Sequence, residues 1–136
     1  MKLLICVLLL PICLIAAPEG IVDAPYEPDY AKGLPERHLW HQVRESFLKH
    51  RYPQILKKHS LRLNCGTCTT VYMDVAFSVN LTGNISVHSI ERTKACGGKF
   101  SEKLQQDFLN FLHEYPYPAG LRGKSVRLRL GTGLKC

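Results

Sequence analysis

Apolar side chains recur along this chain in two rhythms, and each rhythm predicts a different kind of element. Between residues 34 and 52 they recur every three or four positions, which predicts an amphipathic helix that begins near Pro35. The apolar stripe of this helix consists of Leu39, Trp40, Val43, Phe47 and Leu48. Because the residue before a proline is biased out of the helical conformation, we expect Tyr52-Pro53 to end this helix. Pro53 then begins a second, short helix that reaches His59.

Strict alternation of apolar and polar residues follows between Val71 and Val79, which predicts a half-buried strand with Asp74 on its outward face. A turn with Gly83 comes next, since glycine readily adopts a positive φ. Ile85 to Ile90 forms the return strand of a hairpin. Its alternation slips after Val87, which indicates a β-bulge or a strand end.

A second long helix is predicted over Ser101 to Glu114, with Ser101 as its N-cap. Its apolar face consists of Phe100, Leu104, Phe108, Phe111, Leu112 and Tyr115. Ser125 to Leu130 alternates again and predicts the last strand. The order of elements favours an α+β fold: a three-stranded antiparallel sheet, order 2-1-3, with the crossover helix packed on one face together with the N-terminal helices.

The chain before the first helix divides into two segments. Met1 and Lys2 precede fifteen uncharged residues that end in Ala16-Ala17, a pattern typical of a cleaved signal peptide. Fifteen helical residues reach about 22 Å, which is short of a hydrocarbon core of about 30 Å. We therefore expect a signal peptide at 1–17, with a short retained membrane anchor as the alternative. A proline-rich linker is predicted at 18–35, followed by one folded domain at 36–136.

Positive charge exceeds negative charge, with 18 Lys and Arg against 11 Asp and Glu. The basic residues are spread along the sequence, so a well-solvated surface is the simpler interpretation, and attraction to anionic partners is the alternative. Lys124, Arg127 and Arg129 form a cationic row on the last strand, which either blunts that edge against aggregation or attracts an acidic incoming strand.

Three sequence segments, in this order and spacing, resemble the C-terminal domain of the TonB family of periplasmic energy transducers, with the related TolA domain close to it. They are "FLKHRYP" (47–53), "VYMDVAFSVNLTGNISVHSI" (71–90) and "EYPYPAGLRGKSVRLRLG" (114–131). The resemblance covers about residue 43 to the C-terminus. It implies a periplasmic, non-enzymatic domain that captures an extended segment of an outer-membrane receptor or envelope protein by strand addition, linked to outer-membrane transport and energy transduction.

The resemblance also implies which residues bind the partner. The strand at the binding edge consists of Ser125, Val126, Arg127, Leu128, Arg129 and Leu130, and Tyr52 and Pro53 match the Tyr-Pro element of the family near the same surface. Family transducers keep a membrane anchor and a long spacer, whereas the linker here is short. Coupling to the proton-motive force, the partner's identity and the formation of a homodimer are left open by the sequence.

Four cysteines remain after the leader: Cys65, Cys68, Cys96 and Cys136. With the first strand central, all four are expected at one end of the sheet. An exported chain favours two disulfides, which join one of Cys65 and Cys68 to Cys96 and the other to Cys136. One alternative is a zinc site made by the four gathered thiols, which an exported chain disfavours because it meets oxidants first. Another is a redox pair in the CxxC segment, which is disfavoured because this segment precedes a strand and lacks the helix dipole that lowers a redox cysteine's pKa.

Other motifs with chemical meaning are few. The sequence has no metal-binding histidine motif, nucleophile elbow, phosphate loop or paired carboxylates, so we expect no enzyme, cofactor, metal, nucleic acid or small-molecule substrate. Asn80 and Asn84 each begin a glycosylation sequon in the hairpin turn. They favour the alternative function, a secreted, disulfide-stabilised extracellular ligand or defence or reproductive factor of eukaryotic origin. A CxxC thiol oxidoreductase is a third hypothesis.

Overall fold

The computed structural model describes residues 28–136, so the predicted signal peptide and residues 18–27 of the predicted linker lie outside the described part. Two helices open the domain, α1 (Arg37–Ser46) and α2 (Tyr52–Lys58), joined by a π-helical turn (Phe47–Arg51). The remaining elements are β1 (Thr70–Val79), β2 (Ile85–Ala95), α3 (Glu102–Glu114), a 3₁₀ turn (Ala119–Leu121) and β3 (Ser125–Gly133). Between residues 28 and 136, no helix has the length and apolarity needed to span a membrane.

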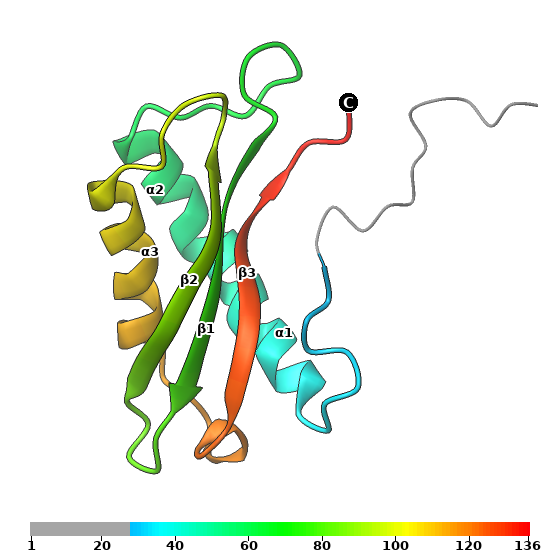
Figure 1. The fold of residues 1–136 in the computed structure, drawn as a ribbon, viewed down its shortest axis with the longest axis vertical. Coiled ribbons are helices and arrows are strands. Elements are labelled where there is room, and N and C mark those ends of the chain that lie inside the picture. The colour runs from blue at the N-terminus through cyan, green and yellow to red at the C-terminus, as the bar shows by residue number, and fades with distance from the viewer. Residues whose placement is uncertain (1–27) are drawn as a thin grey trace, which may run out of the picture.

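The three strands form one antiparallel sheet in the order β2-β1-β3, which confirms the predicted order. All three helices lie on the same face of this sheet (Figure 1). The alternating residues of β1 point toward these helices and are at most 1% exposed: Val71, Met73, Val75, Phe77 and Val79. The helix-covered face of the sheet is therefore one wall of the hydrophobic core.

Aromatic side chains join the helices to each other and to the sheet. Trp40 of α1 is fully buried and meets the ring of Phe77 edge-on, with centroids 5.7 Å apart. The ring centroid of Phe47 lies 5.0 Å from those of both Phe108 and Phe111 in α3. These contacts confirm the apolar faces that were predicted for the two helical segments. Ser101 caps α3 as expected, accepting a hydrogen bond from the backbone N–H of Leu104 at 3.1 Å.

The prediction that Tyr52-Pro53 ends the first helix was wrong, because the helical path continues from Arg37 to Lys58. The reason is a wide π turn directly before the proline. In this turn the backbone N–H of Tyr52 donates to the carbonyl of Phe47, five residues back. The turn shifts the hydrogen-bond register, so that Pro53 lies in the first turn of α2, where its missing N–H is tolerated.

Strands β2 and β3 extend further than the sequence pattern predicted, to Ala95 and Gly133. The slip in β2 is a genuine irregularity: two register shifts against β1 leave His88 and Glu91 without a direct partner. Gly83, at the hairpin turn, has a φ of +87°, as expected for a glycine at this position.

Two disulfides lie at one end of the sheet, as predicted. Cys65 is bonded to Cys136 and Cys68 to Cys96, with Cα–Cα distances of 5.7 and 4.2 Å. The loop before β1 is thus tied to the end of β2 and to the C-terminus, which lies beside this loop (Figure 1). Within residues 28–136, no group of three or more His, Cys, Asp or Glu side chains could hold a metal ion.

Candidate partner-binding edge

The predicted binding strand is an edge strand of the sheet formed by the described residues. Its apolar residues Val126, Leu128 and Leu130 are buried, while Ser125 and Arg127 are exposed. A captured segment would therefore contact the backbone of β3 and its exposed side chains.

The predicted Tyr-Pro element is divided between two places. Tyr52 is 4% exposed, and its hydroxyl donates to the carbonyls of Val71 on β1 (2.7 Å) and Thr132 on β3 (3.2 Å). This tyrosine thus ties the two strands together beneath the sheet. Pro53 is exposed and lines a groove at the end of α2, together with residues of the following loop. The structure brings Tyr52 to the binding strand but leaves Pro53 on a separate surface.

Asp74 and Arg129 form a buried ion pair on the sheet face that lies opposite the helices. They stand directly across from each other on β1 and β3, and the guanidinium binds the carboxylate in bidentate fashion at 2.7 and 2.9 Å. Asp74 is 1% exposed and Arg129 9% exposed. Arg129 belongs to the predicted cationic row and lies on the outward face of β3, but its charge is paired with the carboxylate opposite it and is covered from solvent.

Tyrosine side chains cover this ion pair. The hydroxyl of Tyr30 donates to Asp74 at 2.9 Å, and the guanidinium of Arg129 lies over the ring of Tyr72, 3.8 Å from its centroid. Burial and the hydrogen bond to Asp74 raise the pKa of Tyr30, and the same carboxylate raises the pKa of Arg129. Arg127 lies over the ring of Tyr30 at 5.3 Å and pairs with Glu91 at 2.6 Å, so it also has an acidic partner.

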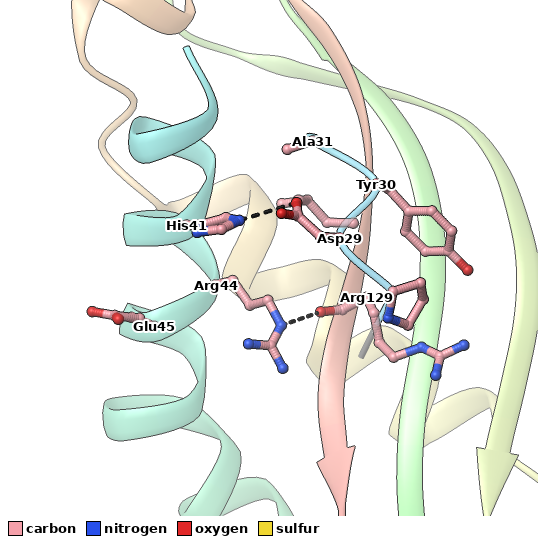
Figure 2. Close-up of a pocket in the computed structure, with 9 residues that line it drawn as sticks. Asp29, Tyr30, Ala31, His41, Arg44, Glu45 and Arg129 are labelled. Atoms are coloured by element: carbon pink, nitrogen blue, oxygen red, sulfur yellow. Dashed lines mark hydrogen bonds and ion pairs between the residues drawn. The ribbon is translucent and has the colours of Figure 1, made fainter. Parts of the chain in front are cut away.

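Residues 28–31, which we call the N-terminal strap, lie between α1 and β3 with Tyr30 reaching across β3 (Figure 2). Asp29 accepts hydrogen bonds from Arg37 (2.7 Å) and His41 (3.1 Å). The hydrogen bond from Arg37 holds the pKa of Asp29 below its usual range. Ala31 is only 1% exposed. This part of the predicted linker is therefore packed on the domain.

The side chain of Arg44 in α1 is hydrogen-bonded to backbone carbonyls at the edge of β3. Its guanidinium donates to the carbonyls of Arg129 at 3.2 Å and Gly131 at 3.4 Å; Figure 2 draws the first of these bonds. A recess of about 190 Å³ opens beside it. The recess is lined by Pro28, Asp29, Tyr30, Ala31, His41, Arg44, Glu45, Leu128 and Arg129. A side chain and the strap thus cover an edge that another strand would otherwise pair with.

Sequence reasoning missed Asp29, Tyr30 and Arg44. The strap has no periodic apolar pattern, and Arg44 lies off the apolar stripe of its helix. One signal was present in the sequence, the charged Asp74 in the middle of the central strand. If another segment covers this side chain, its carboxylate needs a cation or a hydrogen-bond donor as a partner.

Comparison with known proteins gives no family assignment. No family model, curated protein or solved structure matches this chain. The TonB-like interpretation therefore rests on the three sequence segments and their order.

Proposed function

We propose that this protein is an exported, TonB-like protein-binding domain that captures an extended partner segment on the edge of β3. One observation carries the proposal: the carbonyls of Arg129 and Gly131 are held by the side chain of Arg44 and not, among the described residues, by another strand. Backbone acceptors at a sheet edge are the groups that an incoming strand uses.

Arg44 is a donor that a partner can replace. Its hydrogen bonds to these two carbonyls, at 3.2 and 3.4 Å, lie at or beyond the long end of the usual range for N–H···O contacts. An incoming strand would offer its own N–H groups to the same carbonyls, and would have to move Arg44 and the strap aside. Capture would therefore exchange one set of hydrogen bonds for another, with the surface buried by the partner as the net gain.

The partner and the location follow from the TonB resemblance. We expect an outer-membrane receptor or another envelope protein, met in the periplasm and linked to outer-membrane transport. The two disulfides agree with an exported protein, because such bonds persist in oxidising compartments. Energy transduction would in addition need a retained anchor, which concerns residues outside the described part.

The test uses the full oxidised chain, labelled with ¹⁵N, and synthetic peptides that cover the periplasmic N-terminal segments of outer-membrane receptors from the same organism. We expect at least one peptide to shift and protect backbone amides along Ser125 to Leu130. If no peptide changes these amides, the proposal is wrong.

A pair of variants makes this test specific. Arg44→Ala leaves the two carbonyls without their side-chain donor, so we expect the peptide to bind about five to ten times more tightly. The control is Lys49→Ala on the same helical path, since Lys49 pairs only with Glu45, at 3.8 Å, among the described residues. Equal affinities of the two variants would show that the peptide does not use this edge.

A second candidate function, a secreted extracellular factor of eukaryotic origin, is favoured by the hairpin turn. Asn80 and Asn84 are both exposed, and the Asn80 side-chain oxygen accepts a hydrogen bond from the Thr82 hydroxyl of its own sequon at 2.7 Å. Intact mass before and after glycosidase treatment decides between the candidates, because a sugar on either asparagine would favour the secreted factor. The oxidoreductase hypothesis has less support, since Cys65 and Cys68 are bonded to different partners.

A further inference from the structure

A groove of about 500 Å³ lies where α2 ends and the chain turns toward the first disulfide. We call it the α2 groove. It is lined by Pro53, Leu56, Lys57, Ser60, Leu61, Arg62 and Leu63. These residues lie on the helical face of the molecule and share no lining residue with the recess at β3.

The walls of the α2 groove are formed by the end of the helix. Ser60 adopts a left-handed conformation with a φ of 54°, and the N–H of Leu61 donates to the carbonyl of Leu56 at 2.8 Å. The chain therefore folds back and brings two leucines together. Leu56, Leu61 and Leu63 are only partly buried: each packs against the core on one side and lines the groove on the other.

The charge of the α2 groove has one sign. Among the described residues, Lys57 and Arg62 are the only charged ones that line it. Both are exposed, and neither side chain has an ion pair or hydrogen bond within residues 28–136. The carboxylate of Asp107 is engaged elsewhere, by Lys58 at 3.0 Å and His59 at 2.6 Å. The groove thus combines aliphatic walls with two cations that no acid of the described chain neutralises.

We infer that the α2 groove is a second docking surface, which takes an acidic protein segment that carries a large apolar side chain. The partly buried leucines offer an apolar floor for that side chain, and the two cations are placed to meet carboxylates beside it. The groove is shallow and open, so its three leucines can cover one apolar side chain of a peptide while neighbouring acidic residues meet the two cations. The inference is independent of strand capture at β3 and adds a second anchor for a partner.

The experiment titrates the full oxidised chain with three acetylated hexapeptides and follows ¹⁵N amide shifts. The first peptide is Asp-Glu-Leu-Phe-Glu-Asp, the second replaces Leu-Phe by Ser-Ser, and the third replaces every acid by lysine. We expect the first to shift the amides of Leu56 and of residues 60–63, with a Kd on the order of 1 mM or lower. The serine and lysine peptides should bind at least about five times more weakly.

Two double variants with the same change in net charge test the site. Lys57→Glu with Arg62→Glu should weaken binding of the first peptide about tenfold. Arg92→Glu with Lys103→Glu removes exposed cations from β2 and α3 and should leave binding within about twofold. Dispersed amide spectra of both variants will establish that each is folded.

Absent shifts at the α2 groove or shifts centred on another surface would overturn the inference. Equal binding of the serine or the lysine peptide, or equal losses in the two double variants, would also overturn it. Vesicles of phosphatidylglycerol serve as the lipid probe. If they bind the chain through Lys57 and Arg62 while the acidic peptide does not, the groove recognises anionic lipid and the peptide inference is wrong. The amides of β3 report separately on strand capture, so failure of one proposal is distinguishable from failure of the other.

Discussion

At the scale of single residues, the carboxylate of Asp74 organises the sheet face that lies away from the helices. It accepts two hydrogen bonds from Arg129 and one from Tyr30, so three parts of the chain meet at one side chain. A buried pair of this kind adds little over apolar residues of the same shape, but an unpaired partner is costly.

The first prediction concerns this pair. Arg129→Met leaves the Asp74 carboxylate covered without its cation, and should lower the free energy of unfolding by about 3–5 kcal/mol. The double variant Asp74→Leu with Arg129→Met should regain most of this loss, to within about 1–2 kcal/mol of the unaltered protein. Urea unfolding followed by circular dichroism measures both. Equal losses in the single and double variants would mean that packing, and not charge, governs this position.

The second prediction concerns pH and the N-terminal strap. Because the hydrogen bond from Arg37 lowers the pKa of Asp29 in the folded protein, the folded state binds fewer protons than the unfolded state near pH 4. The resulting stability is present above the ordinary pKa of an aspartate, about 3.9, and is lost as the pH falls through the lower folded value. Asp29→Asn should remove this contribution.

We therefore expect the unaltered protein to be more stable than the Asp29→Asn variant at pH 6, and the difference to shrink steadily toward pH 3. Urea unfolding at several pH values measures the difference between the two proteins, in which titrating groups that do not contact Asp29 cancel. A gap that stays constant across this range would show that Asp29 acts only through its shape and neutral hydrogen bonds.

At the scale of elements, periodicity predicted the strands and the apolar helix faces, because each element buries one face against a common core. The alternating apolar residues from Val71 to Val79 and the apolar stripe that includes Trp40 are the residues that this core buries. Where a strand ends, in contrast, depends on its hydrogen bonds to the neighbouring strand. Residues 91–94 of β2 are exposed and give no apolar pattern, although the strand continues through them beside β1.

The same limit explains what was missed at the candidate site. Pro53 predicts a helix end only if the preceding turn is regular, and the sequence pattern does not distinguish the π turn at Phe47–Arg51 from a regular one. The strap is held by contacts of three consecutive residues, Asp29, Tyr30 and Ala31, and three consecutive residues leave no repeating pattern in the sequence. The cysteine positions could be predicted because topology alone places strand ends together.

The third prediction concerns the close approach of β3 to β1 at Gly131, which has a φ of +104°. A Cβ atom there would lie only 2.2 Å from the carbonyl oxygen of Val71. Gly131→Ala should therefore lower the free energy of unfolding by at least about 2 kcal/mol. Gly97→Ala is the control, since a Cβ there meets nothing within 4 Å, and it should stay within about 0.5 kcal/mol. Similar values for the two variants in urea unfolding would contradict the packing at Gly131.

At the scale of the whole molecule, the two disulfides close rings of unequal size. The bond from Cys65 to Cys136 spans 71 residues, and the bond from Cys68 to Cys96 spans 28. Each ring restricts the unfolded chain and should contribute roughly 3–5 kcal/mol by loss of chain entropy. The larger ring restricts it more.

The fourth prediction follows from this difference. Replacing Cys65 and Cys136 by serine should cost about 0.8 kcal/mol more stability than replacing Cys68 and Cys96, if chain entropy governs both bonds. Urea unfolding of the two double variants measures this order. The reverse order would show that the buried packing of Cys68, which is 5% exposed, outweighs the entropy of the larger ring.

The bond from Cys65 to Cys136 also determines how the domain would respond to tension. A segment held on β3 would pull along that strand, and the hydrogen bonds to β1 would share the load in shear. The C-terminal end of β3 cannot peel away, because a covalent link passes the force to the loop that leads into β1, the central strand. The domain would thus act as a tether whose oxidised form resists unzipping, and whose reduced form yields at a lower pulling force.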